Sequence, residues 1–259
     1  MSTAQSSPWI PAGLPRATPA DGRPRVLCFH YSGKGASMFR DWPARLGEAA
    51  EVAAIQLPGR EDRLRDTPIA DIDALLAELV PAVKPWVDAP FVLFGHCMGA
   101  LLAAELAVAL RRQYGVQPHA LVLSAVIPAW QERGSYDLSH LGDAALIREL
   151  RQRGSLTPKM LAEPALLTFI LPSTRADSAL CESIRAKGRP ERPLLDCPLV
   201  LYAGRTDSRF EPEALQAWKA LSTGPTRLTV FEGDHGFLDA NPNAVIDAVR
   251  AELPRGGRP

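Results

Sequence analysis

The sequence lacks two features that mark common protein classes: an excess of one charge and a set of paired cysteines. Its 259 residues hold 29 Lys and Arg against 29 Asp and Glu, so the formal net charge is zero. Nucleic-acid-binding proteins normally carry a basic excess, and we therefore expect no nucleic acid partner. The four cysteines include no C-x-x-C pair, which argues against a disulfide scaffold and against the usual zinc motif. We accordingly expect no bound metal.

The sequence also lacks a segment of the kind that directs a chain into or across a membrane. Its first 24 residues carry five prolines but no apolar run of roughly 7–15 residues behind a basic start, so we expect a disordered tail over 1–24 and no secretory signal. The most apolar stretch, residues 91–110, contains His96, two glycines and Glu105, which favours a turn between a strand and a helix over a membrane span. These features predict a cytoplasmic protein that binds no membrane.

Apolar runs and helical periodicities alternate along most of the chain. The predicted strands are residues 25–30, 51–57, 91–95, 120–126, 198–204 and 226–233. The predicted helices between and after them are residues 37–50, 69–87, 97–113, 212–222 and 242–253. Continuous apolar strands that alternate with helices indicate a parallel sheet covered on both faces. Residues 136–193 have no strand signal but two helical stretches, at 143–153 and 163–185, and we expect a helical insertion there.

The motif Gly95-His96-Cys97-Met98-Gly99 stands between a predicted strand and a predicted helix. It has the form G-x-nucleophile-x-G, and this strand–turn–helix context is the one that a nucleophile elbow requires. Glycine is needed at both ends because a side chain there would collide with the strand or the helix. The positive end of the following helix favours the thiolate form of Cys97. The motif therefore predicts Cys97 as a covalent nucleophile, against the alternative of a buried structural cysteine.

Asp207 and His235 follow in the chain order that this kind of elbow predicts for a catalytic triad. Each comes directly after a predicted strand, and the carboxyl ends of strands are where α/β sheets form their sites. We expect His235 to accept the thiol proton and to return it to the leaving group, while Asp207 orients the imidazole. Asp234 is the rival acid, although adjacent side chains seldom align to form that bond.

The predicted oxyanion hole consists of two backbone N–H groups, those of Met98 and Ser32. Met98 follows the nucleophile, and Ser32 lies in the loop after the first predicted strand. In that loop we interpret His30 as a positioning or substrate-channel residue rather than a catalytic base, and Tyr31 as a second channel candidate. His96 is interpreted as a packed, hydrogen-bonded side chain.

These residues lie in segments that resemble the type II thioesterases of polyketide and nonribosomal peptide assembly lines. The resemblance covers residues 25–253 and is carried by LCFHYSGKGASMFRDW, IQLPGRE, PFVLFGHCMGALLAAELA, LPSTRADSAL, LYAGRTDSRFEPEALQAW and FEGDHGFL. It implies an α/β-hydrolase fold: a mostly parallel sheet with helices on both faces, in two core parts (25–135 and 194–254) separated by a helical lid (136–193).

The same resemblance implies a chemistry and a partner. The triad would be Cys97, Asp207 and His235, acting on acyl groups carried by the phosphopantetheine arm of an acyl or peptidyl carrier protein. The chain would then need no cofactor of its own. A non-catalytic scaffold on the same fold is the alternative from another class, and an intact triad with both elbow glycines speaks against it.

The sequence departs from this family at four positions. The nucleophile there is normally Ser, the positions of His30 and Lys34 are normally Pro and Gly, and the residue after the catalytic His is normally aromatic, where this chain has Gly236. A Cys nucleophile exchanges one thioester for another at nearly equal free energy, so the acyl group can pass to a second thiol or to an amine. We therefore predict a thioesterase, with an acyl or aminoacyl transferase as the alternative.

Two further groups of residues are candidates for substrate and partner contacts. Apolar residues of the predicted lid are candidate lining residues of an acyl channel: Leu161, Leu166, Phe169 and Leu171. Carrier proteins resemble one another in having acidic surfaces, so a neutral enzyme needs a local basic patch to bind them. The candidates for this patch are Lys34, Arg60, Arg63 and Arg65. We expect a monomer.

Overall fold

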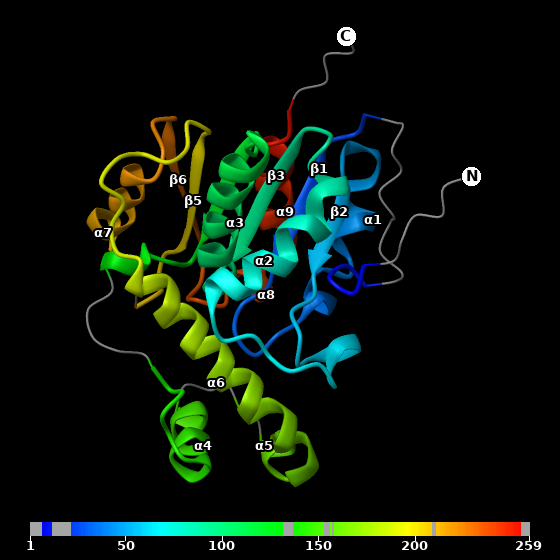
Figure 1. Ribbon diagram of the computed structural model, residues 1–259, viewed down its shortest axis with the longest axis vertical. Coiled ribbons are helices and arrows are strands. Elements are labelled where there is room, and N and C mark those ends of the chain that lie inside the picture. The colour runs from blue at the N-terminus through cyan, green and yellow to red at the C-terminus, as the bar shows by residue number, and fades with distance from the viewer. Residues whose placement is uncertain are drawn as a thin grey trace.

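The computed structural model describes residues 7–11, 22–131, 137–152, 156, 158–208 and 211–254. These residues form one six-stranded sheet in the order β2-β1-β3-β4-β5-β6, with every neighbouring pair parallel (Figure 1). The strands are β1 (Arg25–Phe29), β2 (Glu51–Ile55), β3 (Phe91–His96), β4 (Ala120–Ser124), β5 (Leu199–Gly204) and β6 (Thr226–Phe231). Each overlaps a predicted strand, with ends that differ by one or two residues. Because all six run the same way, the loops that follow them meet at one edge of the sheet.

Helices cover both faces of the sheet because its strands are apolar on both sides. Along β1, Leu27 and Phe29 belong to one buried cluster and Val26 and Cys28 to the other, as the two-residue period of a strand requires. The first face is covered by α2 (Ile72–Val83), α3 (Met98–Tyr114), α7 (Pro212–Gln216) and the C-terminal half of α6 (Pro164–Ala186). The second is covered by α1 (Trp42–Leu46), α8 (Phe237–Ala240) and α9 (Pro242–Ala251).

The predicted helix over 37–50 is wrong in its continuity. The segment consists of η1 (Ala36–Phe39), α1 and η2 (Gly47–Ala49), where η denotes a 3₁₀ turn. Pro43 lies in the first turn of α1, a position that tolerates its missing N–H, whereas a continuous helix would need that N–H as a donor. The other 3₁₀ turns are η3 (Glu61–Arg63), η4 (Lys84–Trp86), η5 (Ala129–Gln131) and η6 (Ala217–Ala220).

The segment between β4 and β5, which we call the lid, is helical as the sequence predicts. It contains α4 (Asp143–Gln152), α5 (Pro158–Leu161) and the long α6, and its α4–α5 end projects away from the sheet (Figure 1). Four leucines form an apolar cluster here that is separate from the two clusters on the sheet: Leu146, Leu150, Leu156 and Leu171. The exact limits of 136–193 for the lid stay a prediction, and part of the segment lies outside the described residues.

The C-terminal half of α6 is fastened to the core by polar contacts. The N–H of Ile72, at the start of α2, donates to Ser183 Oγ at 3.0 Å. Just past the end of α6, Lys187 pairs with Asp73 of α2 at 2.7 Å and with Glu105 of α3 at 2.9 Å. The lid is therefore held at its α6 end.

The prediction of a disordered tail over residues 1–24 is wrong for residues 7–11, one of the two parts of that segment that the structure describes. Trp9 is only 4% exposed and belongs to the main cluster on the first face. Its carbonyl accepts the N–H of Gln56 at 2.8 Å, just beyond β2, and the guanidinium of Arg63 lies over its ring at 4.5 Å. An apolar Trp-Ile pair buried at the sheet edge explains why this segment packs. No described helix is long and apolar enough to cross a membrane.

Candidate active site

Cys97 occupies the sharp turn between β3 and α3. Its φ is 53° and its ψ is −121°, a strained conformation for a residue with a side chain. The flanking glycines make the turn possible: a Cβ at Gly95 would lie 2.1 Å from the carbonyl oxygen of Gly99, and a Cβ at Gly99 would lie 2.3 Å from that of Phe29. The turn holds Cys97 partly exposed at the carboxyl edge, whereas both glycines are buried.

Asp207 and His235 meet at the same edge, from the loops after β5 and β6. Gly204 lets the two loops approach, because a Cβ there would lie 2.3 Å from the carbonyl oxygen of Asp234. The N–H of Thr206 donates to the carbonyl of Gly233 at 3.0 Å and holds the loops together. His235 Nδ1 lies 2.8 Å from Asp207 Oδ2, and the Asp207 side chain is only 4% exposed. This contact leaves Nε2 of His235 for a bond with Cys97.

The proton affinity of His235 reflects both of its partners. Burial by itself lowers the pKa of His235, but side-chain hydrogen bonds with Asp207 and Cys97, together with the negative charge of both groups, outweigh it and raise the pKa from 6.5 to about 10. Asp207 and Cys97 therefore both favour the protonated form of the His235 imidazole.

Asp234, the rival acid, does not contact the imidazole through its carboxylate in the described structure. Its Oδ1 accepts the N–H of Gly236 at 2.9 Å, and the residue is exposed. This is a local turn contact of the kind that Asp commonly makes two residues ahead. The geometry therefore pairs His235 with Asp207 rather than with its neighbour.

The two predicted oxyanion donors are the N–H groups of Met98, at the start of α3, and Ser32, just after β1. The start of α3 and the end of β1 lie close together. Met98 is the first residue of α3, and the first N–H groups of a helix have no partner within it. Ser32 lies in the loop after β1, and its N–H donates no hydrogen bond within the described part of the chain. Gly99 allows this approach, because its missing Cβ would overlap the carbonyl oxygens of Phe29 and His30.

His30 is a buried neutral residue below this loop. It is 1% exposed, its Nδ1 lies 3.0 Å from the carbonyl oxygen of Tyr31, and its Nε2 has no partner among the described residues. Burial and the nearby charge of Arg60 lower the pKa of His30 to about 4. His30 therefore supports the loop from beneath. A role in a substrate channel stays a prediction.

Tyr31 connects two segments beside the candidate active site. Its hydroxyl donates to Asp239 of α8, and Lys34 lies over its ring at 5.7 Å. Burial and the hydrogen bond to Asp239 raise the pKa of Tyr31. The tyrosine thus links the loop after β1 to the segment after His235.

The predicted channel residues of the lid fall into two groups. Leu161 and Leu171 pack within the apolar cluster of the lid, whereas Leu166 and Phe169 are 40% and 41% exposed. No described contact joins any of them to Cys97. Their role in binding an acyl chain stays a prediction.

The predicted basic patch is wrong for Arg60 and is reduced for Arg63. The Arg60 side chain is 10% exposed and pairs with Asp177 of α6, with Nη2 at 2.6 Å from Oδ1. Arg63 pairs with Asp66 at 2.7 Å while it covers Trp9. A guanidinium that is buried in such contacts cannot meet a partner protein. Sequence reasoning missed the Arg60–Asp177 pair, since 117 positions separate its members.

Lys34 and Arg65 remain as exposed members of the predicted patch. Lys34 lies in the loop after β1, beside the predicted oxyanion donor Ser32. Arg65 follows η3, in the loop after β2. Both loops leave the carboxyl edge of the sheet, on which the candidate active site is built.

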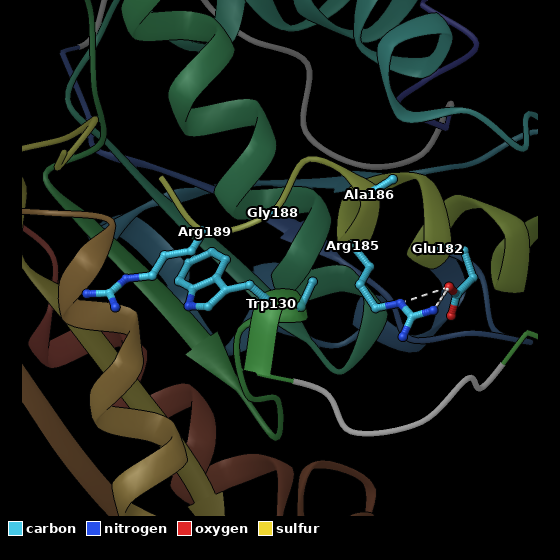
Figure 2. A pocket seen from close by; sticks show the side chains of 7 residues that line it. Trp130, Glu182, Arg185, Ala186, Gly188 and Arg189 are labelled. Carbon is cyan, nitrogen blue, oxygen red and sulfur yellow. Dashed lines mark hydrogen bonds and ion pairs between the residues drawn. The ribbon is translucent and has the colours of Figure 1, made fainter. Parts of the chain in front are cut away.

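A cavity of about 500 Å³ lies elsewhere, where the end of α6 meets η5 (Figure 2). Its lining residues are Ala129, Trp130, Glu182, Arg185, Ala186, Gly188 and Arg189. None of these is a predicted catalytic residue, and two of the three charged side chains, those of Glu182 and Arg185, pair with each other at 2.5 Å. Among the described residues no group of three His, Cys, Asp or Glu side chains is arranged to hold a metal.

Most of the chain is similar to known proteins. Residues 24–253 match the family described as "Thioesterase domain". The gramicidin S biosynthesis protein GrsT of Aneurinibacillus migulanus is 30% identical over 229 residues, which cover 88% of each chain.

Solved structures give the same result. The thioesterase RedJ from the prodiginine biosynthetic pathway in Streptomyces coelicolor superposes with a TM-score of 0.80 at 33% identity and covers 96% of each chain. The type II thioesterase BorB from the borrelidin biosynthetic cluster superposes with a TM-score of 0.81 at 30% identity, over 97% of this chain and 100% of BorB. The predicted α/β-hydrolase fold is thereby confirmed.

Proposed function

Since the chain belongs to the type II thioesterases of polyketide and nonribosomal peptide pathways, we propose that it hydrolyses carrier-bound acyl thioesters. The proposed reaction proceeds through an acyl-Cys97 intermediate. Thioester hydrolysis is the activity of the family. The Cys nucleophile and the triad are our own assignment. One observation carries it: Cys97, His235 and Asp207 come from three strand ends and form one continuous line of hydrogen bonds.

The first half of the reaction uses the thiolate of Cys97. It attacks the carbonyl carbon of the acyl thioester, and the oxygen that becomes negative accepts hydrogen bonds from the N–H groups of Met98 and Ser32. Loss of one such donor in other enzymes costs about 10²–10³ in kcat. As the tetrahedral intermediate collapses, Nε2 of His235 gives its proton to the departing thiol. The acyl group is then held as a thioester on Cys97.

Acylation changes His235 into the base that the second half needs. The Cys97 sulfur is then neutral, and its charge and hydrogen bond no longer raise the pKa of the imidazole. Neutral His235 takes a proton from water as the water oxygen attacks the acyl carbon. Collapse of the second intermediate releases the free acid and restores the thiolate beside the imidazolium. Asp207 keeps the ring oriented through both halves.

The substrate that we propose is an acyl group on the phosphopantetheine arm of an acyl or peptidyl carrier protein. The described relatives RedJ and BorB belong to biosynthetic pathways for natural products, and the same setting for this chain supports a carrier-bound substrate. None of the four cysteines, all of which the structure describes, forms a disulfide, and we propose a reducing, cytoplasmic location. The arm belongs to the carrier, so the chain itself supplies only the triad and the two N–H donors.

Acyl or aminoacyl transfer is the second candidate function, and the sulfur of Cys97 is the observation that favours it. Exchange between thioesters is nearly balanced in free energy, so an acyl-Cys97 that is shielded from water by the lid can pass its acyl group to a second thiol or to an amine. The same triad serves both reactions. The acceptor that reaches the acyl carbon first decides between them.

One experiment tests both functions. A carrier protein loaded with an acyl group is mixed with the enzyme, with and without a second, unloaded carrier, and every species is followed by mass spectrometry. Free acid with no acylation of the second carrier supports hydrolysis. Rapid acylation of the second carrier with negligible free acid would establish transfer instead. Cys97→Ala serves as the control, and turnover that survives in it would reject Cys97 as the nucleophile.

The proposed carrier contact involves Lys34 and Arg65, the exposed cations of the original patch. Reversal of both charges should raise KM for an acyl-carrier substrate and leave KM for a small acyl thioester unchanged, because only the carrier brings an acidic surface. Glu substitution at Arg112, an exposed residue in the last turn of α3 and at the opposite end of that helix from Cys97, is the matched control. Equal effects on both substrates would reject the contact.

A further inference from the structure

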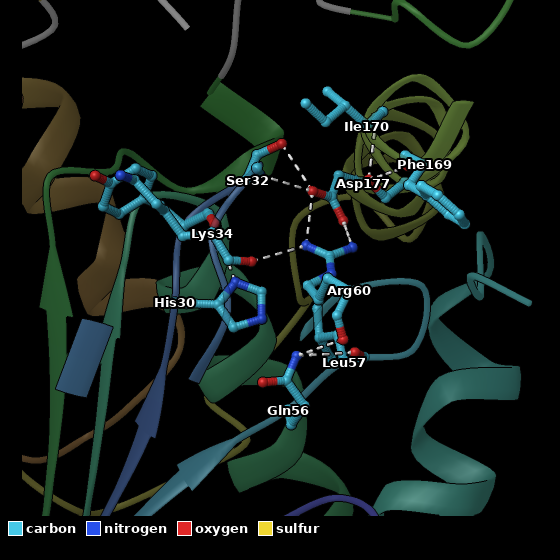
Figure 3. A network of polar contacts seen from close by, with 12 residues as sticks. His30, Ser32, Lys34, Gln56, Leu57, Arg60, Phe169, Ile170 and Asp177 are labelled. Atoms are coloured by element: carbon cyan, nitrogen blue, oxygen red, sulfur yellow. Dashed lines mark hydrogen bonds and ion pairs between the residues drawn. The ribbon is translucent and has the colours of Figure 1, made fainter. Parts of the chain in front are cut away.

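Asp177 is a carboxylate of the lid that is buried against the core. It lies in the C-terminal half of α6 and is 2% exposed. Figure 3 shows it between the loop after β1 and the side chain of Arg60. Ionised carboxylates are seldom buried to this degree unless their oxygens are fully hydrogen-bonded.

Four hydrogen bonds from the core converge on this carboxylate. Arg60 donates two, from Nη2 to Oδ1 at 2.6 Å and from Nη1 to Oδ2 at 3.1 Å, in a bidentate pair (Figure 3). Ser32 Oγ donates to Oδ2 at 2.9 Å, and the N–H of Gly33 donates to the same oxygen at 3.1 Å. Arg60 also donates to the carbonyl of Lys34 at 3.3 Å. One lid residue thus contacts both loops beside the active site.

The contacts with Ser32 and Gly33 fix the part of the loop that our mechanism needs. Gly33 has φ 79°, so the chain turns sharply there, and its N–H is directed to Asp177. The preceding N–H, that of Ser32, is left without a hydrogen bond among the described residues. Asp177 fixes the chain after this N–H, and the hydrogen bond of His30 Nδ1 to the Tyr31 carbonyl fixes the peptide before it, so the N–H stays available for the acyl oxygen.

We propose that Asp177 is a positioning residue that holds the Ser32 N–H in its oxyanion-binding orientation, with Arg60 as its partner. The inference rests on the proposed function, because it assumes that Ser32 stabilises an oxyanion. It ties the lid to catalysis: α6 can leave the core only if Asp177 releases Ser32 and Gly33, and the oxyanion hole is then incomplete. A closed lid and a complete oxyanion hole form together.

The test compares Asp177→Asn with Asp143→Asn. Asp143 belongs to an ion pair with Arg175 inside the lid but is 72% exposed and contacts neither loop, so its variant controls for loss of a lid carboxylate. Two rates are measured on each enzyme: hydrolysis of a small acyl-N-acetylcysteamine thioester, and alkylation of Cys97 by iodoacetamide. Alkylation displaces iodide from a carbon that develops no oxyanion, so it reports on the thiolate alone.

We expect Asp177→Asn to lower kcat about 10- to 100-fold with KM within about 2-fold, because the donor is displaced rather than removed. Its alkylation rate should stay within about 2-fold of wild type, and Asp143→Asn should match wild type in both rates. Wild-type kcat in a folded Asp177→Asn enzyme would overturn the inference. Equal losses in hydrolysis and alkylation would also overturn it, since they would indicate a general structural role.

Ser32→Ala provides a milder variant if Asp177→Asn does not fold. It keeps the N–H but removes the hydroxyl bond to Asp177, and we expect a fall in kcat about 3- to 10-fold with unchanged alkylation. Unchanged kcat in Ser32→Ala would then overturn the inference. Failure of the proposed function has a different signature: enzyme fully alkylated at Cys97 would still hydrolyse the thioester.

Discussion

His96 Nε2 donates a hydrogen bond to the main-chain carbonyl of His235 at 3.0 Å and so links the nucleophile turn to the loop of the proposed base. Its Nδ1 accepts from Ser124 Oγ at 2.9 Å. Burial and the positive charge of His235 lower the pKa of His96 to about 3, so the ring is neutral at physiological pH. The prediction that His96 is a packed, hydrogen-bonded residue agrees with these contacts. Because one of them holds the main chain of His235, we expect His96 to affect the orientation of the proposed base.

His96→Leu should lower kcat about 10- to 100-fold, because the loop of His235 loses an orienting bond and small displacements of a catalytic group are costly. His96→Gln should retain most of the activity, since its amide can still donate to the carbonyl of His235. Steady-state kinetics on a small thioester measure both, and His140→Leu, at a side chain 67% exposed, is the control. Full activity in His96→Leu would contradict this role.

The pKa of His235 should fall when either of its partners is removed. In the wild-type enzyme the value is raised to about 10 by Asp207 and Cys97, so the imidazolium persists across the neutral range. Cys97→Ala removes the charge and hydrogen bond of the sulfur, and Asp207→Asn removes those of the carboxylate. Each variant should titrate at lower pH when the imidazole resonances are followed by NMR. A value that does not change in Cys97→Ala would show that the sulfur carries no charge in the resting enzyme.

His30 should make the fold sensitive to acid. Its pKa in the folded protein, about 4, lies below the ordinary value of 6.5. Between pH 6.5 and 4, His30 therefore binds a proton in the unfolded chain but not in the folded chain. The free energy of unfolding falls as the pH falls through this range. The loss is about 1 kcal/mol per pH unit. Urea unfolding of His30→Leu between pH 7 and 4 should show a correspondingly flatter dependence than wild type, with His119→Leu, at an exposed histidine, as the control. Parallel curves for His30→Leu and wild type would contradict the prediction.

Gly95→Ala should destabilise the protein and abolish activity. The new Cβ would lie 2.1 Å from the carbonyl oxygen of Gly99, so β3 or α3 must shift, at a cost of about 1–3 kcal/mol. Gly142→Ala is the matched control, because no atom lies within 4 Å of its Cβ position. Thermal unfolding and thioester hydrolysis should both separate the two variants. Equal melting temperatures would show that the turn tolerates a side chain.

The sequence predicts the sheet well because its strands are short apolar runs that only a buried parallel sheet accommodates. The chain order of Cys97, Asp207 and His235 follows from that sheet, since each residue comes directly after a strand and all six strands end at one edge. Their hydrogen bonds need only this placement and the glycines that let the loops approach. A local pattern was therefore sufficient to nominate the triad.

The contacts that sequence reasoning missed are long-range and depend on a side chain leaving its expected environment. Arg60 was expected at the surface, yet it pairs with Asp177 in the interior. The prolines around Trp9 predict a disordered tail, yet its side chain packs beside β2. The sequence offers two signals: Arg60 follows the Pro58-Gly59 turn, and Trp9-Ile10 is an apolar pair among prolines. Neither signal identifies the residue that Arg60 or Trp9 contacts. Only the folded chain brings such residues together.

The apolar cluster of the lid shares no buried residue with the two clusters on the sheet. Substitutions at sites without common neighbours have nearly additive effects on stability. Substitutions among the leucines of this cluster can therefore change the size and shape of the lid tip without moving the proposed catalytic residues. Evolution, or directed engineering, can therefore rebuild the tip of the lid without rebuilding the catalytic edge of the sheet.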